Sequence, residues 1–259
     1  MNIKKVLLFL LAQILFFHLF NIIPAQADEY KIFIDIPSRT LELRKDNKIE
    51  KTYPVGVGRS NFPTPTGNFE VITKITNPGW ENPYKPAGIS RIRPGKDNPL
   101  GTRWIGFHRD KNDNEYGMHG TNRPSSVGKY SSHGCVRMRI KDAEDLFDKV
   151  EIGTPVKVTY YTHKLKIKNN KLIIHKYPHV YKRKINPRKM INEQLELIDG
   201  NYNVNEEKLN QALKIRNGAI LTIGEIIHTK ENPDIFHNLS NFLKRKFSKN
   251  KPKPTLNNS

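Results

Sequence analysis

Cysteine is almost absent from this sequence, because Cys135 is the single one among 259 residues. Without a second thiol the chain can form no intrachain disulfide, so such a bond cannot hide this one. The common zinc sites take their ligands in close pairs, such as Cys-x2-Cys or His-x3-His. Cys135 with His108, His119 and His133 would make four ligands, but their spacing fits none of these patterns. A metal site is therefore the less favoured interpretation of this group.

Acidic residues are also scarce, at 25 against 44 lysines and arginines, which gives a formal net charge of +19. In the cytoplasm such an excess would favour nucleic acid as a partner. Outside the cytoplasm, wall polymers, anionic lipid headgroups and peptides with free carboxylates are the abundant anions. The start of the chain decides between the two settings.

Residues 1–27 have the features of a secretory signal peptide. Lys4 and Lys5 form a basic region, residues 6–20 are almost wholly apolar, and Ala25-Gln26-Ala27 is a small-x-small cleavage site. A retained membrane anchor is the alternative, because the apolar run is nearly long enough to span a bilayer. We expect cleavage and export to the periplasm, or to the wall or surface of a Gram-positive cell. This setting excludes nucleic acid as a partner and predicts no stable transmembrane segment.

The mature chain divides into three parts. Residues 28–160 consist of short apolar segments separated by turn signals, which predicts a strand-rich domain. Its one clear helix is expected after Arg139, with Asp142 as the N-cap. Residues 77–101 are so rich in proline and glycine that we expect an ordered irregular loop, of the kind that often forms a lid or binding loop.

The composition changes after residue 160. Residues 161–229 predict a mixed α/β extension, with a hairpin turning at Asn169-Asn170, helices near 189–197 and 205–216, and a short apolar element at 220–227. Residues 230–259 form a basic tail that we expect to be flexible.

Cys135 lies in a setting that favours a reactive thiol. Free cysteines are often buried structural residues, but Ser132-His133-Gly134 before this one is polar and turn-forming, as in an exposed elbow. The thiolate is the nucleophilic species, and a neighbouring imidazole is what produces it near neutral pH. His119, at the end of a predicted strand, is the candidate base.

The other parts of a nucleophilic site can be assigned from residue types. No carboxylate follows His119 closely, so a backbone carbonyl is expected to fix its tautomer. The N–H groups around Gly134 and Cys135 are candidate oxyanion donors, and the planar fork of Arg137 suits a substrate carboxylate. We expect His133 to support the oxyanion site or the substrate, whereas for His108 we prefer a structural role.

The run Met118-His-Gly-Thr121, followed by Ser132-His-Gly-Cys-Val-Arg-Met138, resembles the signature of the L,D-transpeptidase catalytic domain (YkuD-like) of bacterial cell-wall enzymes. Tyr53–Gly58, Pro63–Gly67 and Asn98–Gly101 agree with that family in the same order. The similarity covers about residues 30–160. It implies a mainly β, sandwich-like fold with one or more short helices and with the cysteine at the end of a groove.

The resemblance also implies a role for each matched position. Cys135 would be the nucleophile and His119 the base, with the carbonyl of Gly120 orienting the imidazole. Four further residues would form the oxyanion and substrate pocket around the thiol: Ser132, His133, Gly134 and Arg137.

The implied substrate is a tetrapeptide stem of peptidoglycan. The thiol would attack the bond between its diamino acid and terminal D-Ala, release D-Ala, and pass the acyl group to an amine. The amine would belong to another stem, giving a 3-3 cross-link, or to a wall-linked lipoprotein. No ATP, metal or other cofactor is implied, and carbapenem-type β-lactams are the implied inhibitors. Two alternatives stay open: an L,D-carboxypeptidase that uses water, and an inactive wall-binding protein.

Overall fold

The computed structural model describes residues 30–46, 48–82, 91–95, 97–196, 198 and 201–228. The expectations for the signal peptide and the basic tail lie outside these residues, as does part of the proline-rich loop. Within the described ranges, no helix combines the length and the apolar character needed to cross a membrane.

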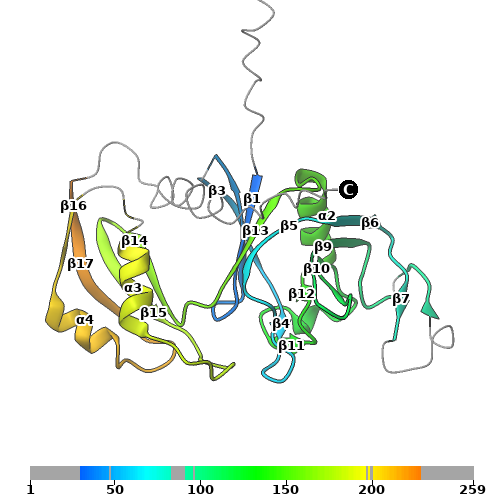
Figure 1. The fold of residues 1–259 in the computed structure, drawn as a ribbon. Helices are drawn as coiled ribbons and strands as arrows, with labels where there is room; N and C mark the ends of the chain where they lie inside the picture. The colour runs from blue at the N-terminus through cyan, green and yellow to red at the C-terminus, as the bar shows by residue number, and fades with distance from the viewer. Residues whose placement is uncertain are drawn as a thin grey trace, which may run out of the picture.

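The described chain forms two units that lie side by side (Figure 1). The first unit contains a five-stranded and a four-stranded sheet, two small strand pairs and two short helices. The five-stranded sheet has the order β3 (Lys48–Pro54), β2 (Thr40–Lys45), β1 (Tyr30–Asp35), β13 (Pro155–Thr159) and β5 (Gly67–Glu70). The four-stranded sheet has the order β12 (Val136–Arg137), β10 (Glu115–His119), β9 (Arg103–Arg109) and β6 (Thr73–Thr76).

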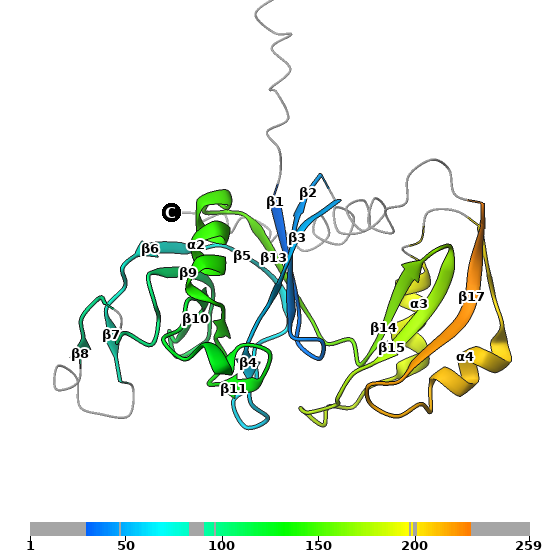
Figure 2. The same cartoon turned by 180° about the vertical axis from the view of Figure 1, so that it is seen from behind.

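The smaller elements of the first unit connect these sheets. The two strand pairs are β4 (Val57–Gly58) with β11 (Tyr130–Ser132), and β7 (Trp80–Glu81) with β8 (Arg91–Ile92). The helices are the 3-10 turn η1 (Pro124–Ser126) and α2 (Ile140–Lys149), which lies beside β9 and β10 (Figures 1 and 2).

Alternation along the strands explains the core of this unit. Ile32 and Ile34 of β1 pair with Leu43 and Leu41 of β2, and all four side chains are fully buried. They meet buried residues of the second sheet and of α2: Ile105, Phe107, Met118, Val136, Ala143 and Leu146. Each such aliphatic side chain contributes about 1.5–3 kcal/mol over an exposed one. The two sheets therefore share one core, as a β-sandwich requires.

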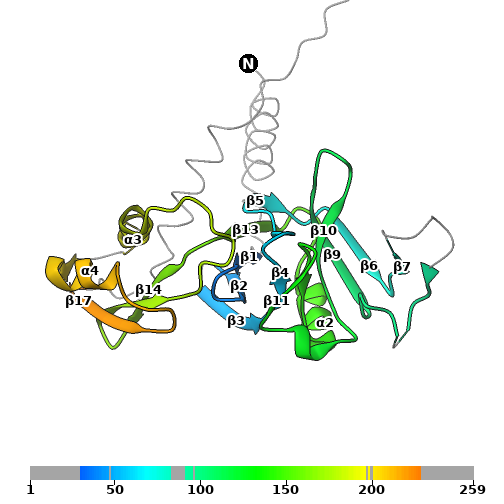
Figure 3. The same ribbon diagram turned by 90° about the horizontal axis from the view of Figure 1, so that it is seen from below.

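The second unit is a four-stranded antiparallel sheet with helices on one face (Figures 1 and 3). Its order is β14 (His163–Lys168), β15 (Lys171–Lys176), β17 (Ile220–His228) and β16 (Asn201–Val204). The helices are α3 (Pro187–Leu195) and α4 (Glu206–Ala212), capped by the side chains of Asn186 and Asn205. Their apolar faces cover a separate core that includes Leu172, Ile174, Ile191, Leu209 and Ile223.

The predicted fold class is confirmed: a mainly β, sandwich-like domain with short helices, followed by a mixed α/β extension. The hairpin turns at Asn169 and Asn170, both at positive φ, as a two-residue turn of the primed type needs. The N-cap prediction was wrong. Helix α2 starts at Ile140 after Arg139, so Asp142 lies in its first turn, where a carboxylate still faces the positive end of the helix dipole.

Candidate active site

Cys135 lies between β11 and β12, beside the end of β10. Strands β10 and β12 are parallel, with Met118 opposite Val136 and His119 opposite Arg137. Side chains alternate between the two faces of a sheet, and the buried Met118 and Val136 point into the core. Cys135, His119 and Arg137 therefore share the other face, where the N–H of Gly117 bonds the sulfur. The local strand pairing thus brings together three residues that the sequence had singled out.

Ser132 shapes the turn that presents the thiol. Its fully buried hydroxyl donates to the carbonyl of Cys135 at 2.5 Å and accepts the N–H of Gly134 at 3.1 Å. Gly134 has φ +113°, and a Cβ there would come within 2.5 Å of the Tyr116 ring, so a side chain at this position does not fit. Ser132 is thus a support beneath the site. The N–H of Gly134, a predicted oxyanion donor, is bonded to Ser132, whereas no acceptor for the N–H of Cys135 is present in the described part of the chain.

His119 is held with one ring nitrogen engaged. It is 4% exposed, and its Nδ1 lies 2.5 Å from the carbonyl oxygen of Gly120. A carbonyl only accepts, so Nδ1 carries the proton and Nε2 keeps its lone pair. The ring also stacks on Trp104, with centroids 5.6 Å apart and planes at 19°. This arrangement provides a base with a fixed tautomer and a fixed ring plane.

Glu115 fixes the tryptophan behind this imidazole. Its Oε1 accepts the indole N–H of Trp104 at 2.7 Å, and its Oε2 accepts from Arg109 at 2.7 Å. Sequence reasoning missed both Trp104 and Glu115. The available signal was their place on strands next to His119, since Trp104 lies directly opposite His119 in the register of β9 and β10.

Burial sets the protonation states of the pair. It lowers the pKa of His119 to about 4, with Arg137 lowering it further and the Gly120 carbonyl acting in the opposite direction. Burial also raises the pKa of the Cys135 thiol above its ordinary value of 9.0, against the effects of the Gly117 N–H and Arg137. These shifts favour a neutral thiol and a neutral imidazole on the same sheet face at pH 7. This arrangement suits proton transfer during attack rather than a preformed ion pair.

Two arginines, Arg59 and Arg137, act on His133 at the exposed side of the site, which we call its mouth. Arg59 donates to Nε2 of the exposed His133 at 2.7 Å, and its guanidinium lies over the Phe62 ring. Phe62 in turn meets the His133 ring edge-on, with centroids 4.6 Å apart. Partial desolvation of the imidazole lowers the pKa of His133, and the charges of Arg59 and Arg137 lower it further. The mouth is therefore electropositive and offers planar donors for carboxylates.

His108 lies between the rings of Phe69 and Tyr116, with centroid distances of 4.7 and 5.7 Å, and the Tyr116 ring separates it from Gly134. These contacts fit the structural role preferred for it. Among the residues that the structure describes, no three His, Cys, Asp or Glu side chains are grouped to hold a metal ion.

A model of the L,D-transpeptidase catalytic domain (YkuD) matches residues 29–158. The chain belongs to this family. Sequence relatives within it include the putative L,D-transpeptidases YqjB and YkuD of Bacillus subtilis (strain 168). YqjB is 42% identical over 139 residues, covering 52% of this chain and 74% of YqjB. YkuD is 36% identical over 129 residues, covering 50% of this chain and 65% of YkuD.

More distant L,D-transpeptidases match the same region. The probable L,D-transpeptidase YbiS of Escherichia coli (strain K12) is 35% identical over 113 residues, which are 40% of this chain and 35% of YbiS. The match thus spans about two thirds of YkuD and about a third of YbiS. A solved L,D-transpeptidase from Mycobacterium smegmatis is 20% identical, with a TM-score of 0.40 and coverage of 51% of this chain and 59% of that one. L,D-transpeptidase 3 from Mycobacterium tuberculosis, solved with a faropenem-derived adduct, is 19% identical, with a TM-score of 0.41 and coverage of 51% and 60%.

Proposed function

We propose that this member of the L,D-transpeptidase family acts on tetrapeptide stems of peptidoglycan, with Cys135 as nucleophile and His119 as general base. The observation that carries the proposal is the buried imidazole of His119. Its Nδ1 is bonded to the Gly120 carbonyl, and it lies on the same sheet face as the thiol.

In the first half-reaction, Cys135 attacks the carbonyl between the diamino acid and the terminal D-Ala. Nε2 of His119 takes the thiol proton as the carbon–sulfur bond forms, and the N–H of Cys135 donates to the oxyanion. The carbon–nitrogen bond then breaks, the D-Ala amine takes the proton from His119, and a thioester remains.

In the second half-reaction, an amine attacks the thioester. Its proton passes to His119 and then to the departing sulfur, so the thiol is restored. One amide has been exchanged for another, which is why no ATP is needed. The acceptor amine would come from a second stem or from a wall-linked protein.

The electropositive mouth supports this choice of substrate. Stem peptides carry free carboxylates, and Arg59 and Arg137 provide charged planar donors near the thiol. The setting outside the cytoplasm, proposed from the signal-like residues 1–27, would bring the enzyme to the wall. We extend the proposal to inhibition and expect a carbapenem-type β-lactam to acylate Cys135. A thiol that can attack the amide of a stem peptide can also open the strained amide of a β-lactam ring.

The decisive experiment incubates the purified protein with defined muropeptides and identifies the products by mass. We expect free D-Ala and 3-3 linked dimers. If tripeptide stems accumulated and no dimers formed, the protein would instead be an L,D-carboxypeptidase that uses water. Release of no D-Ala from any tetrapeptide stem would contradict both activities and leave the inactive wall-binding protein.

A further inference from the structure

The 59–66 loop, between β4 and β5, carries the side chains that flank His133. Arg59 and Phe62 both contact that imidazole, which lies two residues before Cys135. The loop contains Pro63 and Pro65 and belongs to no sheet. Its shape therefore depends on contacts made by its ends and by its buried Thr64.

A side chain from the segment between β15 and α3, Tyr181, contacts the residue before this loop and the middle of the loop, and it packs against the core of the first unit. The Tyr181 hydroxyl donates to the carbonyl of Gly58 at 2.8 Å and accepts the backbone N–H of Thr64 at 3.0 Å. A phenolic hydroxyl can donate and accept at once, so the two bonds are compatible. Inside the loop, the Thr64 hydroxyl accepts the N–H of Gly58 at 2.9 Å. Gly58 and Thr64 are therefore linked twice: directly, through the Thr64 hydroxyl, and indirectly, through the hydroxyl of Tyr181.

Tyr181 is itself firmly held. Its ring stacks on Tyr160, with centroids 5.1 Å apart and planes at 17°, and its N–H donates to the Tyr160 hydroxyl at 2.8 Å. Arg183 lies over both rings and donates to the Thr66 hydroxyl at 2.9 Å, at the far end of the loop. The segment after β15 therefore contacts the beginning, the middle and the end of the loop.

We propose that Tyr181 is a positioning residue for the active site. Its hydroxyl holds the 59–66 loop in the conformation that presents Arg59 and Phe62 to His133 at the mouth of the Cys135 site. The family match ends at residue 158, so this contribution comes from outside the catalytic domain. The inference rests on the proposed function for its kinetic consequence, but not for its effect on the loop.

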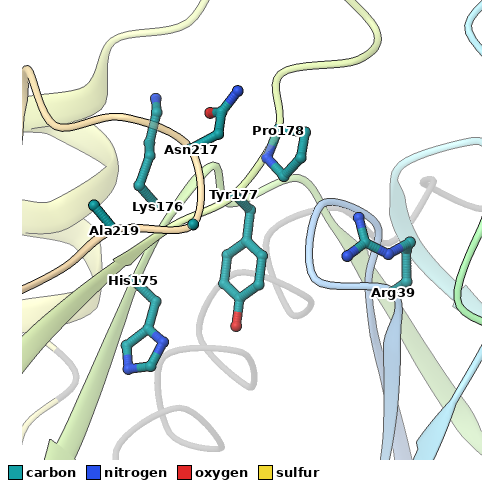
Figure 4. Close-up of a pocket in the computed structure, with 8 residues that line it drawn as sticks. Arg39, His175, Lys176, Tyr177, Pro178, Asn217 and Ala219 are labelled. Atoms are coloured by element: carbon teal, nitrogen blue, oxygen red, sulfur yellow. The ribbon is translucent and has the colours of Figure 1, made fainter.

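The junction of the two units offers a matched control. A cavity of about 330 Å³ lies between them, lined by Arg39 of the first unit and by residues of the second that include Tyr177 (Figure 4). Tyr177 is a second half-buried tyrosine of the same segment, and no hydrogen bond from its hydroxyl to the 59–66 loop is present among the described residues. Removing its hydroxyl tests the effect of a tyrosine-to-phenylalanine change at the junction without touching the loop.

The first measurement compares Tyr181→Phe with Tyr177→Phe. Hydrogen exchange followed by mass spectrometry should show faster exchange of the 59–66 peptide in Tyr181→Phe alone. Steady-state release of D-Ala should show kcat/KM lowered about tenfold in that variant, mainly through a higher KM, as expected for two lost hydrogen bonds. Tyr177→Phe should match the wild type in both. Unchanged loop exchange in Tyr181→Phe would overturn the proposal, as would faster exchange with wild-type kcat/KM.

A second measurement separates positioning from a general loss of stability. Tyr181→Phe is combined with Arg59→Ala in a double-mutant cycle on kcat/KM. If Tyr181 acts through Arg59, the double variant loses little more than Arg59→Ala alone; if the two losses multiply, positioning through Arg59 is wrong. Should the wild type release no D-Ala while loop exchange still responds to Tyr181→Phe, the proposed function fails and the effect on the loop stands.

Discussion

Each unit of this protein buries one histidine whose pKa is lowered to about 4. Only one of the two is placed to act as a base. His119 in the first unit and His163 in the second owe the shift chiefly to burial. His119 uses Nδ1 for the Gly120 carbonyl and keeps Nε2 for a proton. His163 has both nitrogens engaged, Nδ1 near the Thr162 hydroxyl and Nε2 3.2 Å from the Lys176 amine.

This comparison shows that a perturbed pKa alone does not mark a catalytic residue. What distinguishes His119 is Nε2, which has no hydrogen-bond partner within the described ranges of the chain, together with its place on the sheet face that also carries a thiol. His163 has the Lys176 amine at one nitrogen and no thiol in contact within the part of the chain that the structure describes, and it is fully buried in its own unit. The first unit should therefore carry the chemistry, while the second contributes its own stability and a contact to the active-site loop.

The largest effect is expected for Cys135→Ala. Without the sulfur no thioester forms, so D-Ala release should fall to background. The side chain is only partly buried, and alanine keeps the backbone free to form the turn around Ser132. The far-ultraviolet circular dichroism and the thermal midpoint should therefore remain near those of the wild type. Substantial D-Ala release by this variant would remove the assignment of the nucleophile.

Next in size is the contrast between the two histidines. His119→Ala should lower kcat/KM for D-Ala release by about 10²–10⁴-fold, the usual contribution of a general base. His163→Gln should leave kcat/KM nearly unchanged and lower the free energy of unfolding instead. Urea titrations and initial rates on the same preparations check both results. If His163→Gln impaired catalysis as strongly as His119→Ala, the distinction between the two sites would be lost.

A buried ion pair joins the two units. Its removal should lower the free energy of unfolding and leave kcat/KM unchanged. Nζ of Lys164 lies 3.2 Å from a carboxylate oxygen of Glu42 and 3.9 Å from one of Asp35. Burial favours the neutral amine, but these carboxylates raise the pKa of Lys164 above its ordinary value. Lys164→Met should cost about 3 kcal/mol of unfolding free energy, since it leaves buried carboxylates with one cation fewer.

The matched control for this change is Lys166→Met, on the same strand and exposed to solvent. It should alter the unfolding free energy by less than about 0.5 kcal/mol, as exposed charges usually do. Equal effects of the two substitutions in urea titrations would mean that the ion pair does not stabilise the junction.

Much of the first unit could be predicted from sequence because its information is local. The alternation of apolar and polar residues predicted the strands. The short motif around Cys135 lies next to β12, and the pairing of β12 with β10 brings it to His119. In the sequence, the loop 59–66 stands out only through Pro63–Gly67, which agrees with the L,D-transpeptidase family. Its partner Tyr181 could not be predicted, because it lies 123 residues from Gly58 and packs against the core of the first unit from the segment after β15. Asp142 was misplaced because the backbone of Arg139, two residues after β12, already takes the N-cap conformation.

The smallest predicted difference between a variant and the wild type lies in a pH dependence of stability to which both histidines contribute. Each has a folded pKa of about 4 against an ordinary 6.5, so the unfolded chain binds protons that the folded chain does not. Their contribution is complete above pH 6.5 and is lost as the pH falls towards 4. From pH 7 to pH 5 each should cost roughly 2 kcal/mol of unfolding free energy. This window lies above the range in which carboxylates such as Glu42, whose pKa is lowered by Lys164 and Arg44 against the effect of burial, begin to protonate. Urea titrations at the two pH values should show a loss in His163→Gln that is smaller than the wild-type loss by roughly 2 kcal/mol. An undiminished loss in that variant would mean that His163 takes up its proton without opposing the fold.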